Sequence, residues 1–222
     1  MSKPGYADLE ALFDAFDGTG DLDEPRARKR RRILGAASRR FLDQGYRKTT
    51  VEEVAGDAGV AKGTVYLYFP SKADLLIHAV AEEKRHYVLA MAPVLTAEMP
   101  AAERLRTWVR VGLGLAEQMP LTARLIRGDR EILAVVHDLG DAWTGMVDTQ
   151  IGVVAELLGD AAPHLRRHKA QLLERTRILL GLLFAAALTT DARLRGGLDP
   201  ERWADGLSRL ILDGILAKES SR

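Results

Sequence analysis

Apolar residues recur along this chain at intervals of three and four, and strand-like alternation is almost absent. The breaks in the pattern fall at glycine, proline and aspartate residues, which favour turns. The spacing therefore predicts an all-α protein. We expect helices over residues 26–42, 51–58, 62–69, from a Ser71 cap onward, 101–118, 120–127, 140–158, 164–190 and 200–217.

Two of these helices are short and lie close together. The segment 51–58 carries one apolar stripe, and Thr50 with Glu53 forms a capping-box pattern at its start. Gly59 breaks this helix, and a second short helix follows until Pro70 ends it. Two short helices joined by a tight glycine turn have the form of a helix-turn-helix, in which the second helix enters the major groove of DNA.

The residue types around this turn suit contact with DNA. Lysines offer charge to phosphates, hydroxyl groups donate hydrogen bonds, and a glycine lets the backbone approach closely. The candidate DNA-binding residues are Thr50, Lys62, Gly63, Thr64, Tyr66, Tyr68 and Lys72. Phe69, in contrast, is expected to be a core residue because its neighbours are apolar.

Charge is distributed unevenly, although the whole chain has a formal net charge of only +1. Residues 1–25 carry one lysine and seven acids, which gives −6. Residues 26–72 carry twelve basic and four acidic residues, which gives +8, and residues 73–222 carry −1. A basic module of this kind is typical of a nucleic-acid-binding domain.

The stretch 49–76, TTVEEVAGDAGVAKGTVYLYFPSKADLL, resembles the DNA-binding domain of the tetracycline-repressor (TetR) family of bacterial regulators. The shared features are a Thr-Thr entry, an Ala-Gly-Val turn, Lys-Gly-Thr, a Tyr-x-Tyr-Phe end and a Ser-Lys-x-x-Leu-Leu start of the next helix. Ala61 departs from the family pattern, which has a serine or threonine to cap the recognition helix. Gly56 is a further weakness, because glycine destabilises a helix interior.

The resemblance implies an N-terminal three-helix helix-turn-helix DNA-binding domain and a larger helical ligand-binding and dimerisation domain. We divide the chain into an acidic extension at 1–25, the DNA-binding domain at 26–75 and the larger domain at 76–222. By position, the family pattern places Thr50 and Lys72 on phosphates and the other candidates on the recognition-helix face.

The family's members are homodimers whose larger domain encloses a small-molecule pocket. The apolar run Ile178–Leu188 and the Trp203 stripe of the last helix are consistent with a dimer interface, and an intrachain core is the alternative. Large side chains on the middle helices are the candidates for a ligand pocket, with ordinary core packing as their alternative. They are Trp108, Met119, Trp143, Met146, Gln150 and Phe184.

These features predict a ligand-responsive transcriptional regulator, a repressor that binds a pseudo-palindromic double-stranded DNA operator as a homodimer. A small apolar or aromatic effector would release it. The alternative is a DNA-binding structural or positioning protein of the same fold without small-molecule control. A ligand-sized pocket in the second half of the chain favours the first function and a solid core favours the second.

No catalytic constellation is apparent in the sequence, so an enzyme is not indicated and no cofactor is expected. The chain has no cysteine, and His164 with His168 lacks a third metal ligand. The longest apolar run has 11 residues, well short of the roughly 20 that span a bilayer. The first residues, MSKPGYADLE, do not form a signal peptide, and we expect a cytoplasmic protein.

Two charged segments leave alternatives open. The basic run 26–32 is either a solvated helix start or an arm that contacts phosphates or the minor groove. The acidic extension 1–25 has an apolar helical face and is either a solvated tail or an amphipathic helix. In the second case its charge would compete with DNA for the basic module.

Overall fold

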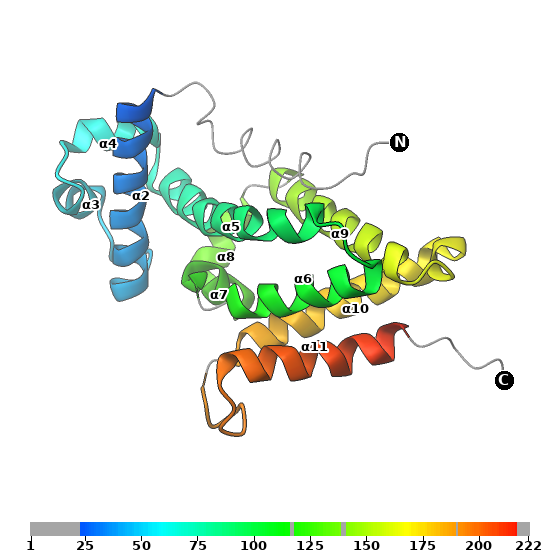
Figure 1. The fold of residues 1–222 in the computed structure, drawn as a ribbon. Coiled ribbons are helices and arrows are strands. Elements are labelled where there is room, and N and C mark those ends of the chain that lie inside the picture. The colour runs from blue at the N-terminus through cyan, green and yellow to red at the C-terminus, as the bar shows by residue number, and fades with distance from the viewer. Residues whose placement is uncertain (1–22, 116–117, 139–140, 190, 217–222) are drawn as a thin grey trace. The chain divides into compact units, whose positions relative to one another are not determined.

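The structure, a computed structural model, describes residues 23–115, 118–138, 141–189 and 191–216, without the side chains of 141–144 and 146. Within these ranges the elements are helices joined by turns and loops, and there are no strands (Figure 1). The prediction of an all-α fold with an N-terminal helix-turn-helix is confirmed. The amphipathic helix considered for the acidic extension 1–25 lies outside the described residues up to residue 22, and Glu24 and Pro25 already belong to α2.

The chain divides into two compact units. The N-terminal unit contains the described residues up to His86 and the segment 118–144, and the C-terminal unit contains 87–115 and 145–216. The segment 118–144, which the sequence analysis assigned to the larger domain, thus groups with the helix-turn-helix.

The helices described in the N-terminal unit come from both of its segments. They are α2 (Glu24–Gln44), α3 (Val51–Asp57), α4 (Lys62–Tyr68), the first part of α5 (Lys72–Thr96), α7 (Pro120–Ile126), α8 (Arg130–His137) and the first residues of α9 (Asp141–Ala161). Asp23 caps α2 by accepting a hydrogen bond from the Arg26 amide at 3.0 Å. Gly45 ends this helix with φ +85°, a conformation that L side chains rarely adopt.

One apolar core holds this unit together. Residues at helical spacing on α2, α3 and α5 meet residues from α4, α7 and α8, and all are almost fully buried. The largest fully buried members are Ile33, Leu34, Phe41, Phe69, Leu75, Leu76 and Leu121. Phe69 is 1% exposed, so its expected core position is confirmed.

Helix α8 was not predicted from the sequence. Its apolar residues form a nearly continuous, partly β-branched run in only eight residues, which hides the helical period. Asp129 supplies the N-cap, accepting from the amides of Glu131 at 3.0 Å and Ile132 at 3.3 Å. This cap was the available signal for a helix.

Polar side chains fasten α7 and α8 within the N-terminal unit. Glu83 of α5 caps α7, accepting from the Leu121 amide and from the amide and hydroxyl of Thr122, each at 2.9 Å. Burial raises the pKa of Glu83, and these hydrogen bonds oppose the rise by stabilising the carboxylate. Arg124 of α7 donates to two carbonyl oxygens in the last turn of α2, those of Phe41 at 3.0 Å and Leu42 at 2.6 Å.

The C-terminal unit contains the end of α5 and the remaining helices. These are α6 (Ala101–Leu115), α9 (Asp141–Ala161) from Gly145 onward, the 3-10 turn η2 (Leu165–Arg167), α10 (Lys169–Ala187) and α11 (Pro200–Leu216). The prediction of one helix over 164–190 is wrong at its start, because His168 leaves the helical conformation with φ −124° and ψ 75°. The unit's core includes Met91, Leu105, Trp108, Val109, Leu158, Leu179 and Leu212.

The last two helices bury only part of their apolar surface within the chain. On α10, Leu179 is fully buried while Ile178 is 51% exposed and Leu182 is 45% exposed. On α11, Leu212 is buried while Leu210 is 77% exposed. The run Ile178–Leu188 is therefore only partly buried within this chain, and an apolar surface remains on both helices.

Candidate nucleic-acid interface

Helix α3 begins with the predicted capping box. The Glu53 amide donates to Oγ1 of Thr50 at 3.3 Å, and the Thr50 amide donates to Oε2 of Glu53 at 2.8 Å. The Thr50 hydroxyl also donates to the same carboxylate at 2.8 Å. Thr50 is therefore exposed, but its hydroxyl is engaged in the cap. A phosphate that binds this hydroxyl would compete for it with the Glu53 carboxylate.

The turn between α3 and α4 has the geometry of a helix-turn-helix. Gly59 adopts φ +62°, and the Val60 amide donates to the Ala55 carbonyl at 3.0 Å. Val65 and Phe69 are each 1% exposed and fix α4 on the core. One face of α4 is thereby buried and the opposite face is free.

The free face of α4 contains some of the predicted residues and one that was missed. Lys62, Gly63 and Tyr66 are exposed, and Thr64 and Tyr68 are half-buried at its edges. Leu67 also lies on this face, 85% exposed. In the sequence, the signal for an exposed Leu67 is that it is apolar but falls out of phase with Val65 and Phe69.

Lys62 forms an ion pair across the turn with Glu52 of α3. This hydrogen bond raises the pKa of Lys62 and lowers the pKa of Glu52. The Lys62 ammonium also lies 5.9 Å from the centre of the Tyr66 ring. Both charged partners are exposed, so the pair is easily exchanged for another contact.

Lys72 occupies a different position from the other candidates. Its ammonium donates to the carbonyl oxygens of Tyr46 at 2.9 Å, Arg47 at 3.3 Å and Thr49 at 3.0 Å. It also lies 4.4 Å from the centre of the Tyr46 ring. An ammonium has three donors, so Lys72 holds the loop that leads into α3, and its role as a phosphate ligand stays a prediction.

The same loop is held from two further sides. The buried Thr49 hydroxyl donates to the Gly45 carbonyl at 2.8 Å. The Arg47 amide donates to Oε2 of Glu131 at 2.9 Å. Because the loop is fixed, the exposed Arg47 and Lys48 side chains start from a defined backbone, and they are basic residues that the sequence reasoning did not single out.

An ion pair sets α3 against α2. Arg40 donates to both carboxylate oxygens of Asp57, from Nε at 2.6 Å and from Nη2 at 2.8 Å. Its Nη1 lies 3.4 Å from Glu53. The Arg40 guanidinium holds the pKa of Asp57 below its ordinary value, and the two-point contact fixes the orientation of α3.

The basic segment 26–32 divides into two kinds of residue. Arg30 is 4% exposed; its guanidinium donates to Nδ1 of His78 at 3.1 Å and lies 5.1 Å from the centre of the Phe69 ring. Arg30 therefore belongs to the packing of α2 and not to a free arm. The other basic residues of the segment are exposed: Arg26, Arg28, Lys29, Arg31 and Arg32.

The six ligand candidates are spread over several helices. Trp108 is buried in the core of the C-terminal unit, while Gln150 of α9 and Met119 before α7 are half-buried. Phe184 is 36% exposed on α10. Trp143 and Met146 lie in α9 among the residues whose side chains the structure does not describe. A shared pocket for the six remains a prediction.

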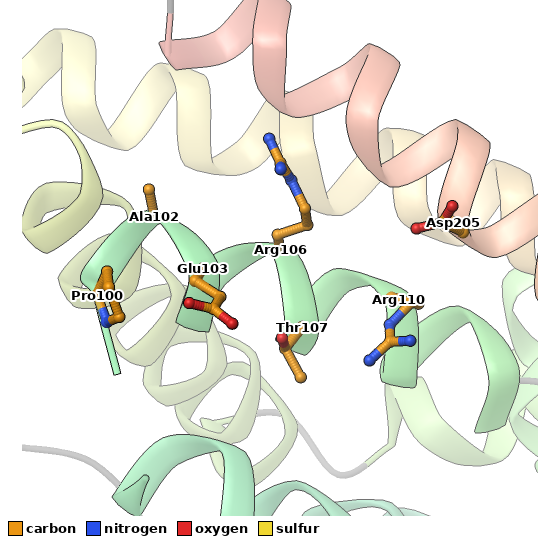
Figure 2. Close-up of a pocket in the computed structure, with 7 residues that line it drawn as sticks. All are labelled: Pro100, Ala102, Glu103, Arg106, Thr107, Arg110 and Asp205. Atoms are coloured by element: carbon orange, nitrogen blue, oxygen red, sulfur yellow. The ribbon is translucent and has the colours of Figure 1, made fainter. Parts of the chain in front are cut away.

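A hollow of about 500 Å³ lies in the C-terminal unit, lined by α6, its preceding residues and α11 (Figure 2). Its lining contains none of the six candidates and no buried residue. The lining residues are Pro100, Ala102, Glu103, Arg106, Thr107, Arg110 and Asp205. The hollow is thus a charged surface feature, in contrast to the apolar pocket expected from the sequence.

Among the described residues, no three histidine, cysteine or carboxylate side chains gather as a metal site would require. None of the helices described is long and apolar enough to pass through a membrane.

Comparison with known proteins relates the N-terminal region to a family. Residues 33–79 match the family described as bacterial regulatory proteins, tetR family. The HTH-type transcriptional regulator RutR of Escherichia coli K12 is 26% identical over 208 residues, which cover 90% of this chain and 97% of RutR. The fatty acid metabolism regulator protein of Bacillus subtilis is 36% identical over 73 residues, 33% of this chain and 38% of that protein.

Solved structures share the fold over most of the chain. The fatty acid degradation regulator FadR of Bacillus halodurans has a TM-score of 0.66 at 20% identity, covering 91% of this chain and 100% of that one. FadR of Bacillus subtilis in complex with stearoyl-CoA has a TM-score of 0.63 at 18% identity, covering 84% and 97%. AibR in complex with isovaleryl coenzyme A and operator DNA has a TM-score of 0.59 at 20% identity, covering 82% and 97%.

Proposed function

Because this chain belongs to the TetR family of bacterial transcriptional regulators, we propose that it is a ligand-responsive repressor that binds a pseudo-palindromic operator as a homodimer. The observation that carries the proposal is the geometry of α4. Its buried face is fixed by Val65 and Phe69, and its free face offers Lys62 and Tyr66 beside the turn. This is the arrangement in which a recognition helix enters the major groove.

The candidate residues divide into two roles in this proposal. Lys62 and Tyr66 read base edges, with Gly63 allowing close approach and the half-buried Thr64 and Tyr68 contacting the groove walls. Thr50 and Lys72 act on the backbone side, at the loop before α3. The three carbonyl contacts of Lys72 support a role in positioning this loop toward a phosphate, with its charge contributing to the local field.

We propose the domain division 26–75 and 76–222 as the functional one, with the dimer formed by α10 and α11. The exposed apolar side chains of Ile178, Leu182 and Leu210 support this interface, since each helix also carries fully buried residues and is well anchored. Two recognition helices in such a dimer would meet half-sites about 34–36 Å apart, or a multiple of it.

The effector is proposed to be apolar in part, held among the middle helices of the larger domain. Two of the similar solved structures are complexes with acyl-coenzyme A ligands, stearoyl-CoA and isovaleryl-CoA, and these are the first probes to use. A ligand releases the protein from DNA only if it prefers the conformation that binds the operator poorly.

The deciding experiment has two stages. A duplex is first selected from a random library with the full chain, and its affinity is measured against salt concentration. Stearoyl-CoA, isovaleryl-CoA and the corresponding free acids are then titrated into the complex, with coenzyme A alone as the control. Release by an acyl compound at a concentration where coenzyme A has no effect supports the repressor.

Two results would count against the proposal. Equal affinity for selected and random DNA would remove the sequence-reading function of α4. Tight binding of small molecules without any change in operator affinity would favour a DNA-positioning protein of the same fold.

A further inference from the structure

The leucine on the free face of α4 is not explained by the fold. Leu67 is 85% exposed, while the neighbouring apolar residues Val65 and Phe69 are each 1% exposed. It is also absent from the partly buried residues that pack against the core of the N-terminal unit. A single exposed leucine is common on protein surfaces, so its meaning depends on what surrounds it.

A second residue on the same face is also unexplained by the fold. Gly63 lies one helical turn before Leu67, and a Cβ added there would meet no atom of the protein within 4 Å. Its φ is not positive, so the backbone does not require glycine. Glycine within a helix is destabilising relative to alanine, and the fold gives no reason for a glycine at this position.

The polar residues of this face indicate what it meets. Lys62 and Tyr66 flank the Gly63–Leu67 line, and Tyr66 is 43% exposed. A basic residue and a phenolic hydroxyl beside an apolar side chain fit a surface that is polar at most positions and apolar at one. The major groove has this character, because thymine alone among the four bases presents a methyl group there.

Leucine has no hydrogen-bond donor or acceptor, so it discriminates among bases only by apolar contact and by shape. Placed over guanine, adenine or cytosine, it would cover polar groups at the base edge without satisfying them, which is unfavourable. Placed over thymine, it would bury the methyl group and its own exposed surface together.

We propose that Leu67 determines operator specificity by packing on the 5-methyl group of one thymine in each half-site, while Gly63 lets the backbone of α4 come close enough for this contact. The inference rests on the proposed function, namely that α4 enters the major groove. It adds the residue that selects a base and the chemical group that it recognises.

Uracil substitution tests this contact, because it removes the methyl group and leaves the base-pairing edge unchanged. An operator is selected with the full chain, and each thymine is replaced in turn by deoxyuridine. We expect one position in each half-site to lose about fourfold in affinity, the value of one buried methyl-sized group. Leu67→Ala should lose affinity for the thymine operator and show no further loss with deoxyuridine at that position.

The matched control is Leu194→Ala. Leu194 is 71% exposed in the turn before α11, so its truncation removes a similar exposed surface from the C-terminal unit. Operator affinity should be unchanged in this variant, and the deoxyuridine penalty should persist. Thermal unfolding of both variants should match the parent, since neither side chain is buried.

Three results would overturn the inference while leaving the proposed function intact. They are a selected operator without thymine in its half-sites, a parent protein that is insensitive to every deoxyuridine, and a penalty that persists in Leu67→Ala. In each case Lys62→Ala or Tyr66→Ala would still reduce the preference for operator over random DNA. If the parent shows no such preference, the proposed function itself fails.

Discussion

The two units of this protein differ in where their exposed apolar side chains lie. In the N-terminal unit Leu67 is 85% exposed on α4, a short helix whose neighbouring loop is held by the polar contacts of Lys72 and Glu131. In the C-terminal unit Ile178, Leu182 and Leu210 are exposed on two long helices, α10 and α11, that are otherwise well packed. A single exposed leucine among polar residues fits a contact with DNA, whereas apolar side chains spread over two helices fit the permanent association of two subunits.

The strongest test of this contrast is to introduce charged residues on the exposed apolar surface of α10 and α11. Leu182→Asp together with Leu210→Asp should abolish the dimer without unfolding the chain, because both positions are exposed. Two linked heads bind far more tightly than one, so operator affinity should fall by roughly a hundredfold or more. Sedimentation gives the oligomeric state, and gel shift gives the affinity. An intact dimer in the double variant would assign both helices to another role.

The next effect is expected at Lys72. Lys72→Met removes the three hydrogen bonds that hold the loop before α3 and one positive charge. Affinity should fall by about tenfold for operator and random DNA alike. The slope of log affinity against log salt concentration should become shallower by about one, the value of one phosphate contact. Lys48→Met removes a similar charge without these bonds. Equal effects of the two variants would show that Lys72 acts by charge alone.

Glu83 tests whether α7 belongs to the stability of the N-terminal unit. Glu83→Ala removes the cap that binds Leu121 and Thr122, and it should lower the free energy of unfolding by about 1–2 kcal/mol. Glu83→Gln keeps one acceptor oxygen and should lose less. Urea denaturation measures both variants. An unchanged midpoint in Glu83→Ala would mean that α7 is held by apolar contacts only.

Two glycines on exposed helix faces provide a smaller, paired test. An added Cβ meets nothing within 4 Å at either Gly56 or Gly63, so each change to alanine should stabilise the fold by about 0.5–1 kcal/mol. Only Gly63→Ala should weaken operator binding, because only that residue lies on the free face of α4. Equal affinities would place the DNA contact elsewhere. Thermal melting and operator titration together separate the two effects.

The smallest expected change is a gain in DNA affinity. Glu52→Gln removes the carboxylate that pairs with Lys62, leaving its ammonium available for DNA and removing repulsion of phosphates. We expect roughly a threefold tighter complex at about 0.1 M salt, with less difference at higher ionic strength. A weaker complex would show that the ion pair orients Lys62 in the bound state. Glu98→Gln, at an exposed position between α5 and α6, is the matched control.

Much of the N-terminal unit could be predicted from the chain because its signals are local. The Thr50–Glu53 cap, the Gly59 turn and the Ser71 start of α5 each depend on residues within a few positions of one another. Helix α8 escaped prediction because its eight residues hide the apolar period, although Asp129 marked its start. Leu67 falls out of phase with the buried Val65 and Phe69, and the apolar character of a leucine by itself favours a core position, so its exposure had to be read from the structure.

The sequence by itself determined the all-α class, the helix-turn-helix and the resemblance to the TetR family, since these depend on short-range spacing and on a run of specific residues. Only the tertiary structure decided which side chains of α4 are free, and that Lys72 binds the carbonyls of a loop more than twenty residues away. It also showed that Arg30 packs against Phe69 within the unit. Such pairings depend on how distant helices meet, and the apolar period of one helix carries no information about its partner.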